Sequence, residues 1–379
     1  MNAGVRHLYV HLPFCAHRCG YCDFVTVVGR RDQHSAYVDA LLRELEVEQG
    51  VLARPLETIF VGGGTPSFTE ASALERLFGA LPAAEEITVE VNPESVTPEL
   101  AALLRECGVN RVSVGVQSFE PRLLAVLERR AGPDDIRRAV YALRDAQFDN
   151  ISLDLIYGIP GQGPADLERD LSEAVALGPE HLSCYELEAK PGTRFTHAHG
   201  AELMRQSEAM EAYFEHVVEV LTRAGYRWYE TSNFCRQPEG AGGLDLRARH
   251  NMGYWLGRDY LGLGIGAVST IEGLRRRTTP RLAAYLAALA RGERPPRDLE
   301  PLDGATRRRE RLLLGLRLDE PVALGGVEEV VDGQALERLE RLGLARRVRD
   351  RGGGGGSLGV TLTRRGRFLG GGVTAELVR

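Results

Sequence analysis

The chain has 379 residues, of which 43% are hydrophobic and 26% are charged, and its formal net charge is −6. These values are typical of a soluble globular protein with more than one domain, and the acidic balance argues against a nucleic-acid binder with a basic surface. No apolar run approaches the ~20 residues of a membrane span. The polar start from Met1 to His7 does not look like a secretory leader, so we expect a cytoplasmic protein.

Short apolar runs alternate with amphipathic stretches from Leu8 to about Glu230, which is typical of repeated βα units around a parallel sheet. Six repeats are enough for most of a (β/α) barrel. The predicted strands are Leu8–His11, Thr58–Gly62, Ile87–Val91, Arg111–Val116, Ile151–Ile156 and His181–Glu186. The predicted helices are Ser35–Gln49, Glu70–Leu81, Pro98–Glu106, Pro133–Gln147 and Ala165–Leu177.

The first predicted strand leads into a loop with three cysteines, Cys15, Cys19 and Cys22, in the spacing C-x3-C-x2-C. This spacing is too tight for one face of a helix or strand, so we expect the loop to curl around a metal group. Each iron of a 4Fe-4S cluster is normally held by one Cys thiolate, and three ligands leave one iron open for a small molecule. Two alternatives remain: a zinc site with His17 as the fourth ligand, and a disulfide, which needs an oxidising compartment.

Polar residues gather at the carboxyl ends of the other predicted strands. In a parallel barrel these ends meet at one rim, where such folds place their chemistry. A plainer interpretation is open for each of them, since Glu90 or Asp154 alone is often a solvated charge and a glycine run is often a simple turn. The residues concerned are Gly62, Gly63, Gly64, Thr65, Glu90, Asn92, Gln117, Asp154, Tyr185 and Glu186.

After the sixth strand we expect a loop over Pro191–Gly200, a long helix over Glu202–Ala224 and a strand over Arg227–Glu230. A glycine-rich insertion follows at Gly240–Gly243. The later run with Gly262, Gly264 and Gly266 predicts a strand against which something packs closely.

A His, an Asn, a Tyr and one of the two tryptophans lie within six residues, His250-Asn-Met-Gly-Tyr-Trp255. A polar ring needs a partner when it is buried, and on the residues alone a local packing cluster is the favoured interpretation. The alternative is a flat cofactor that lies on Trp255, with His250 as an axial ligand to its metal, because neutral imidazole commonly binds iron.

The last hundred residues follow the order helix, strand, flexible tip, strand, which is the outline of a winged helix. Arginines near the tip keep a DNA-binding regulator as an alternative, but the acidity of the chain and the lack of interleaved aromatic residues favour a lid or docking domain. The predicted elements are helices at Thr279–Arg291, Thr306–Arg317 and Gln334–Leu342, strands at Leu344–Arg349 and Gly359–Thr363, and a tip at Gly352–Gly356.

Together these motifs resemble the radical S-adenosylmethionine (SAM) superfamily, and within it the oxygen-independent coproporphyrinogen III oxidase-like group. The resemblance extends over nearly the whole chain. It rests on the cysteine loop, Gly62-Gly-Gly-Thr-Pro66, Val89-Glu-Val-Asn-Pro93, Gly115-Val-Gln-Ser-Phe119 and Leu153-Asp-Leu-Ile-Tyr-Gly-Ile-Pro160.

We therefore predict an α/β fold, a partial (β/α)6 radical-SAM barrel followed by a smaller α+β, winged-helix-like domain. The expected division places the barrel in residues 1–235, a linking segment with the His250 element in residues 236–278, and the carboxyl-terminal domain in residues 279–379.

The resemblance implies that Cys15, Cys19 and Cys22 bind a 4Fe-4S cluster whose fourth iron is chelated by the amino and carboxylate groups of SAM. Arg130 follows one of the matching residues, Arg129, and the match does not say which arginine points inward. The residues that match SAM-site positions are Tyr9, Tyr21, Gly63, Gly64, Thr65, Glu90, Gln117, Arg129 and Asp154.

Within the group, the residues favour the heme chaperone branch over the porphyrinogen oxidases. The oxidases carry a fourth cysteine two residues beyond the third, where this chain has Phe24, and a long extension ahead of the cysteine loop. The His-Asn-x-x-Tyr-Trp element resembles the heme-binding motif of the chaperone branch. This resemblance implies that heme is bound by His250, Asn251, Tyr254 and Trp255.

The expected function is therefore to bind heme and to transfer it to an acceptor protein, with a 4Fe-4S cluster and an exchangeable SAM as further cofactors. The alternative is an oxygen-independent coproporphyrinogen III oxidase, which cleaves SAM reductively and decarboxylates a porphyrinogen, so whether the chain is an enzyme stays open. The expected partners are heme and an acceptor of unknown identity, and no nucleic acid. Membrane association through the acceptor and a homodimer are also left open.

Overall fold

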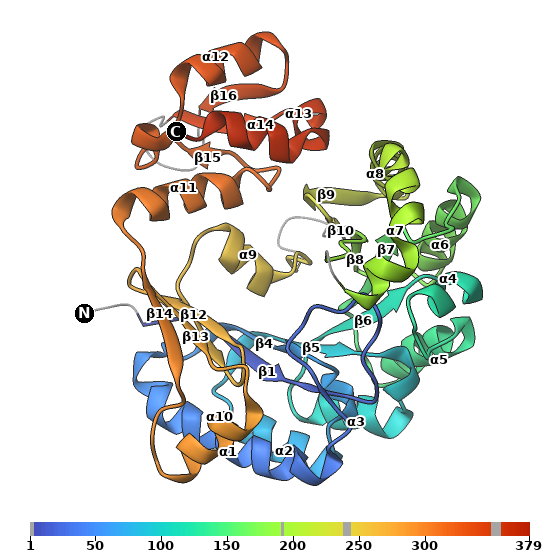
Figure 1. Cartoon of the computed structure of the whole chain (residues 1–379), viewed down its shortest axis with the longest axis vertical. Helices are drawn as coiled ribbons and strands as arrows, with labels where there is room; N and C mark the ends of the chain where they lie inside the picture. The colour runs from blue at the N-terminus through green and yellow to red at the C-terminus, as the bar shows by residue number, and fades with distance from the viewer. Residues whose placement is uncertain (1–3, 191–192, 238–243, 350–357) are drawn as a thin grey trace.

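The computed structural model describes residues 4–190, 193–237, 244–349 and 358–379. Parallel strands form the middle of its main sheet, and each of the six predicted runs is one of them (Figure 1). Their bounds are β1 His7–Leu12, β4 Leu56–Gly63, β5 Ala84–Val91, β6 Arg111–Gln117, β7 Ile151–Tyr157 and β8 His181–Glu186.

Helices cover the outer face of this curved sheet (Figure 1). Proline at the first helical position starts several of them, because its missing N–H has no partner there in any helix. The five predicted helices are α1 His34–Glu48, α2 Ala71–Ala80, α3 Pro98–Glu106, α5 Pro133–Asp145 and α6 Pro164–Ala176. A short helix that was not predicted, α4 Pro121–Val126, follows β6. The α/β class with a partial barrel is confirmed.

The parallel strands alternate between an apolar outer face and a polar inner one. In β1, Leu8 and Val10 are fully buried beneath the helices, whereas Tyr9 between them faces the barrel interior and is only half-buried. In β7, the same alternation turns Asp154 inward between Leu153 and Leu155. The inner face can therefore hold polar ligands while the outer face supplies the main core.

Both edges of the sheet carry further strands. Strand β11 pairs with β1 in parallel, and every later strand at either edge runs antiparallel to its neighbour. Within the described residues, twelve strands form this sheet in the order β14-β13-β12-β11-β1-β4-β5-β6-β7-β8-β10-β9. The edge strands are β9 Tyr226–Glu230, β10 Asn233–Arg236, β11 Tyr260–Leu263, β12 Val268–Ile271, β13 Leu274–Thr278 and β14 Arg297–Pro301.

The predicted loop over Pro191–Gly200 is wrong from Arg194 onward, where α7 (Arg194–Gln206) begins. The Thr193 hydroxyl accepts the Thr196 N–H, which satisfies one of the free donors at the start of the helix. The predicted long helix is therefore two helices, α7 and α8 (Met210–Arg223), separated by a tight turn. The insertion Gly240–Gly243 lies outside the described residues.

The His250 element is a short helix, α9 Arg249–Trp255, which lies against the barrel near the middle of the molecule (Figure 1). After it, α10 (Leu282–Ala290) still packs on the main core through Tyr285 and Leu289. A second apolar core begins with Leu312 in α11. The boundary at residue 279 stays a prediction, and this packing favours a later one.

Within the described residues, the last part of the chain forms a three-stranded antiparallel sheet, β15-β17-β16, with four helices. Its elements are α11 Gly304–Gly315, β15 Val322–Ala323, α12 Gly333–Arg341, β16 Ala345–Arg349, β17 Leu358–Leu362, α13 Arg364–Phe368 and α14 Gly370–Leu377. The predicted glycine tip lies outside the described residues, and the winged-helix assignment stays a prediction.

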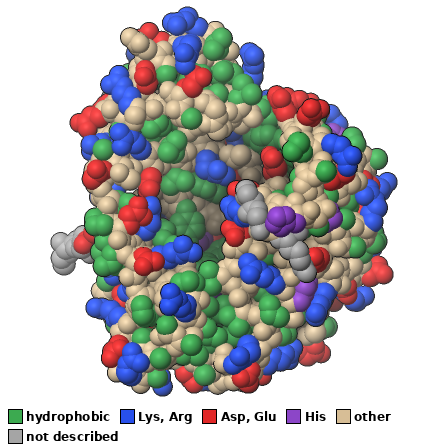
Figure 2. Space-filling model, in the orientation of Figure 1, with side chains coloured by type: hydrophobic (Ala, Val, Ile, Leu, Met, Phe, Trp, Pro, Cys, Tyr) green, Lys and Arg blue, Asp and Glu red, His purple; other side chains and the backbone are tan. Residues whose placement is uncertain are grey.

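The surface in Figure 2 carries interspersed acidic and basic side chains, and a hollow opens near its centre. Among the described residues, no helix combines the length and apolar character that are needed to cross a membrane.

Candidate functional site

The cysteine loop is tied to the barrel rim by a small parallel pair of strands, β2 (Phe14–Cys15) and β3 (Val27–Val28). Gly29 donates its N–H to the Cys15 carbonyl at 2.8 Å, which closes the loop behind the cysteines. All six cysteines of the chain are free thiols, so the predicted disulfide alternative is not found. The loop therefore presents its three thiols with the backbone already folded around them.

The glycine run after β4 allows the cysteine loop to approach the strand end. Gly63 has a φ of +117°, and a Cβ there would lie 2.5 Å from the His11 ring. A Cβ on Gly64 would lie 2.4 Å from the Pro13 carbonyl oxygen and 3.0 Å from Cys15 Sγ. These contacts require glycine for close packing, and the run also leaves its backbone open to a ligand.

Half-buried carboxylates lie on the inner face of β5 and β7. The Glu90 carboxylate accepts the Gly63 N–H at 3.0 Å, and burial raises the pKa of Glu90 to about 7. The Asp154 carboxylate accepts the Ser113 hydroxyl at 2.9 Å, and burial raises its pKa as well. Neither carboxylate forms an ion pair among the described residues, so both suit a ligand that carries positive charge.

Of the two neighbouring arginines, Arg129 lines the cavity and Arg130 is exposed, so Arg129 is the one that faces inward. Its Nη2 donates to the Gly115 carbonyl at 2.7 Å and to Asn92 Oδ1 at 3.0 Å. Its Nε is buried and has no partner among the described residues. An unused donor of this kind in a polar cavity is what a carboxylate or hydroxyl of a ligand would satisfy.

These groups surround one cavity of about 740 Å³ at the carboxyl ends of the parallel strands. Tyr9 does not line it, since its hydroxyl bonds His11 Nδ1 at 2.9 Å and its ring stacks on Phe60. The SAM role of Tyr9 stays a prediction, like those of the other residues. Of the residues predicted at the rim, Gly62 does not line the cavity. The predicted residues that line it are Cys15, Cys19, Cys22, Tyr21, Gly63, Gly64, Thr65, Glu90, Asn92, Gln117, Arg129, Asp154, Tyr185 and Glu186.

The thiols fit a cluster better than a single ion. No three His, Cys, Asp or Glu side chains among the described residues are close enough together to hold one metal ion. A 4Fe-4S cluster presents a separate iron to each thiolate and so needs the thiols around a cavity rather than at one point. The proposed fourth zinc ligand, His17, lies with Nε2 3.9 Å from Cys19 Sγ, but the same nitrogen bonds the Glu128 carbonyl. Burial raises the pKa of the Cys15 and Cys19 thiols, so metal binding would have to displace their protons.

Helix α9 forms a second polar site, at the opposite end of the strands. The His250 ring is buried, with Nδ1 2.8 Å from the Thr58 hydroxyl and Nε2 2.9 Å from the Tyr254 hydroxyl. The Glu86 carboxylate accepts the N–H of His250 at 3.2 Å and caps the start of the helix. Burial lowers the pKa of His250 to about 3, so its imidazole is neutral.

The remaining predicted heme residues are less enclosed. Trp255 is half-buried, with its ring edge-on to Tyr229 at 6.2 Å between centroids, and Asn251 is half-buried one residue after His250. In this structure α9 is a well-packed helix, as the plainer interpretation expected. Its heme role stays a prediction.

Sequence reasoning missed two inward-facing residues of β6. Ser113 lines the cavity and holds Asp154, and Arg111 is 2% exposed at the start of the strand. The signal was present, because Arg111, Ser113, Gly115 and Gln117 alternate along one face.

Comparisons with known proteins agree with this geometry. The family model described as "Radical SAM superfamily" matches residues 9–174. The chain is 37% identical to the heme chaperone HemW of Synechocystis sp. over 330 residues, which cover 82% of this chain and 77% of that one. It is 33% identical to HemW of Bacillus subtilis, with 83% of each chain covered, and 35% identical to HemW of Escherichia coli, with 72% of each covered.

A solved structure with the same fold is coproporphyrinogen III oxidase (HemN) from Escherichia coli, described as a radical SAM enzyme. It superimposes with a TM-score of 0.79 over 99% of this chain and 90% of that one, at 22% sequence identity. At this identity the match supports the fold alone.

Proposed function

Because the chain belongs to the radical SAM superfamily, and within it to the HemW branch of the coproporphyrinogen oxidase-like group, we propose that it binds heme and delivers it to an acceptor protein. The proposal rests on sequence identity of 33–37% to chains named heme chaperone over about four fifths of the length. The geometry of His250 gives it a residue that could bind the iron.

His250 is prepared as a neutral ligand. The Thr58 hydroxyl has one proton and lies 2.8 Å from Nδ1 of both His7 and His250, so it donates to one ring and accepts from the other. When His250 is the donor through Nδ1–H, its Nε2 carries the lone pair that iron requires. A hydrogen bond of this kind fixes the orientation of metal-binding histidines. Nε2 now faces the Tyr254 hydroxyl, which must leave it before iron binds.

The rim cavity is assigned to the 4Fe-4S cluster and SAM. Cys15, Cys19 and Cys22 would hold the cluster, and a bound cluster would supply electrons to SAM. Arg129 would orient an anionic or hydroxyl group through its free Nε, while Glu90 and Asp154 would favour a cationic centre.

The test is a heme titration followed by the Soret absorption, with the wild type and His250→Ala compared. We expect saturable binding by the wild type and at least tenfold weaker binding by the variant. Unchanged binding by His250→Ala would remove the residue assignment, whereas absence of binding by the wild type would remove the function. Circular dichroism of the variant checks that α9 still packs on the barrel.

A second candidate function is porphyrinogen decarboxylation, because the cavity retains the whole set of SAM-site positions apart from Tyr9. Phe24 stands 66% exposed where the oxidases carry their further cysteine, which favours the chaperone. Anaerobic incubation with coproporphyrinogen, SAM and a reductant separates the two functions. The chaperone is expected to give no vinyl product.

A further inference from the structure

A second cavity, of about 640 Å³, lies between the end of α9, the β11–β13 edge of the sheet and α11. None of its lining residues is shared with the rim cavity that holds the cysteines. Tyr254 lines it, and the hydroxyl of the same tyrosine bonds His250 Nε2. The cavity therefore lies directly beyond the residue that covers the proposed iron ligand.

The walls of this cavity are basic although the chain as a whole is acidic, with a net charge of −6. Arginines outnumber carboxylates around it, and they come from three separate segments. Its basic lining residues are Arg258, Arg275, Arg307, Arg308 and Arg311, and its acidic lining residues are Asp259 and Glu310.

Some of these arginines are already paired. Arg275 Nη2 contacts both carboxylate oxygens of Glu310, at 2.7 and 2.8 Å, its Nη1 lies 3.4 Å from Glu300, and Arg258 pairs with Glu57. Such pairing fixes a guanidinium and leaves it little capacity for a ligand.

Two arginines on α11 remain available. Arg311 has no carboxylate partner among the described residues, and its one hydrogen bond is a long one of 3.3 Å to the Trp255 carbonyl. Arg307 forms no side-chain hydrogen bond or ion pair within the described part of the chain. Burial and the neighbouring Arg258 lower the pKa of Arg311, which means that its positive charge is disfavoured there. An anion beside Arg311 would offset this cost. Arg308 is already ion-paired with Glu329 at 2.8 Å, and only its buried Nε lacks a partner among the described residues.

The rest of the lining is aromatic and apolar. The Tyr254 and Tyr260 rings meet edge to face at 4.6 Å between centroids, and Leu302, Leu314 and Val327 complete the wall. A ligand that fits has a flat apolar body and carboxylates at one edge, which are the features of heme with its two propionates.

We propose that this cavity receives heme, with its propionates held by Arg307 and Arg311 and its ring against Tyr254 and Tyr260. This inference rests on the proposed heme-binding function and adds the recognition of the carboxylates to it. Iron binding by His250 and carboxylate binding by α11 are then two separable parts of one site.

The test uses protoporphyrin IX, which has the propionates but no iron, and its dimethyl ester, which has neither iron nor free carboxylates. Binding is measured by porphyrin fluorescence for the wild type, Arg307→Gln/Arg311→Gln, and the matched control Arg309→Gln. Arg309 lies on the same helix but outside the cavity, where its Nε bonds the Arg379 carbonyl. Thermal unfolding checks that the variants fold alike.

We expect the double variant to bind protoporphyrin IX and heme at least about tenfold more weakly, because charge-assisted bonds to both propionates are lost. The ester should bind wild type and double variant equally, and Arg309→Gln should match the wild type. His250→Ala should weaken heme but not protoporphyrin IX.

The assignment of this cavity would be overturned if the wild type bound protoporphyrin IX and its dimethyl ester with equal affinity, or if Arg309→Gln lost as much affinity as the double variant. It would also be overturned if AMP, a flat anion that is not a porphyrin, displaced protoporphyrin IX. If wild type binds heme and only His250→Ala weakens it, the proposed function stands and the cavity assignment fails. If wild type binds neither heme nor protoporphyrin IX, the function itself fails, and the cavity assignment fails with it.

Discussion

Tyr254 controls access to His250, since its hydroxyl lies 2.9 Å from the Nε2 that would bind iron. Tyr254→Phe removes this competitor without opening a large hole. A hydrogen bond of this type is worth about 1 kcal/mol, so we expect about fivefold tighter heme binding in a Soret titration.

Tyr260→Phe is the matched control for this change, because Tyr260 contacts the Tyr254 ring but not His250, and phenylalanine keeps the ring that would lie against the heme. Its heme affinity should stay close to that of the wild type. Weaker heme binding by Tyr254→Phe would mean that the hydroxyl itself holds the heme rather than excluding it.

If SAM binds in the rim cavity as proposed, we expect Glu90 to make its binding depend on pH. Burial raises the pKa of Glu90 to about 7, so the carboxyl is largely protonated at pH 6 and largely ionised at pH 8. The sulfonium of SAM favours the ionised form, and below the pKa its binding must expel a proton. We expect the affinity for SAM to rise about tenfold from pH 6 to pH 8.

This dependence is measured by calorimetry on the anaerobically reconstituted protein. In Glu90→Gln the side chain at position 90 is uncharged at every pH, so only the SAM amine and other groups still titrate. The affinity of this variant for SAM should therefore change less with pH than that of the wild type. Parallel profiles for the two proteins would exclude Glu90 as the titrating group.

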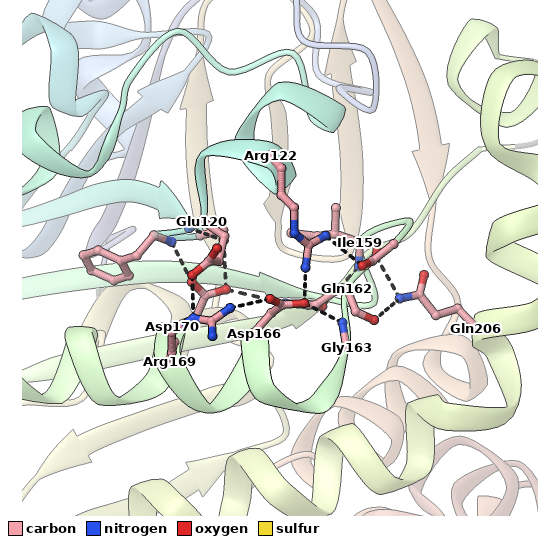
Figure 3. A network of polar contacts seen from close by, with 12 residues as sticks. Glu120, Arg122, Ile159, Gln162, Gly163, Asp166, Arg169, Asp170 and Gln206 are labelled. Atoms are coloured by element: carbon pink, nitrogen blue, oxygen red, sulfur yellow. Dashed lines mark hydrogen bonds and ion pairs between the residues drawn. The ribbon is translucent and has the colours of Figure 1, made fainter.

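At the scale of elements, α6 fixes two loops of the barrel rim through Asp170 (Figure 3). The buried Asp170 carboxylate accepts the Ser118 hydroxyl at 2.8 Å and the Phe119 N–H at 2.6 Å. Gln117, immediately before them, has a φ of +68° and lines the rim cavity. The helix therefore helps to hold a residue of the rim cavity in a conformation that is unfavourable by itself.

Asp170→Ala leaves these donors buried without a partner. We expect a loss of about 3 kcal/mol in the free energy of unfolding, measured by urea denaturation, together with weaker SAM binding. Asp145→Ala, at an exposed position on α5, is the control and should change the free energy of unfolding by less than about 0.5 kcal/mol. A loss of stability with unchanged SAM affinity would show that the loop keeps Gln117 in place without Asp170.

The elements that the sequence predicted well are those whose pattern is set by burial. The six parallel strands were recognisable because their outward-facing residues are apolar and are covered by helices, and α3 was predicted with its observed bounds. Strands β12, β13 and β14 were missed because an edge hairpin rich in arginine, such as Leu274–Thr278, lacks that apolar signal. The start of α7 was missed as well, because we expected a loop up to Gly200, whereas the Thr193 hydroxyl caps a helix that begins at Arg194.

The candidate site was predictable where it lies within one motif. The cysteine loop and the glycine run after β4 could be predicted because the residues of each lie next to one another in the sequence. The contacts of His250 with Thr58 and Glu86 span 192 and 164 residues, and only the folded barrel brings them together. The same holds for the second cavity, whose arginines come from three separate segments, at Arg258, at Arg275 and at residues 307–311.

At the scale of the whole molecule, Arg367 joins the last part of the chain to the barrel. Its guanidinium lies 3.5 Å from the centroid of the Trp228 ring, and its Nη1 donates to the Trp228 carbonyl at 2.8 Å. Arg367→Ala removes a cation–π contact and buried stem packing, so we expect a loss of about 2 kcal/mol in the free energy of unfolding. Hydrogen exchange in β16 and β17 should become faster.

Arg364→Ala is the control for this change, because Arg364 is exposed and 5.4 Å from the Phe368 ring centroid. It should leave both the stability and the exchange rates close to those of the wild type. Equal exchange rates in Arg367→Ala and wild type would show that the docking depends on other contacts, such as the ion pair of Arg227 with Asp319.

The two proposed cofactor sites lie at opposite ends of the same strands. Gly63 ends β4 and lines the rim cavity, whereas Thr58, near its start, holds His250. Tyr9 and Phe60 fill the barrel between the two sites.

Heme binding at α9 should therefore not need the cluster. We expect the triple variant Cys15→Ser/Cys19→Ser/Cys22→Ser to lose iron, sulfide and SAM binding but to keep its heme affinity within about twofold, which is less than ~0.5 kcal/mol. Anaerobic iron and sulfide assays with a Soret titration measure both properties on one sample. A parallel loss of heme binding would mean that the sites are coupled through Tyr9 and Phe60, and Phe60→Leu, with its cluster intact, would then be expected to weaken heme binding as well.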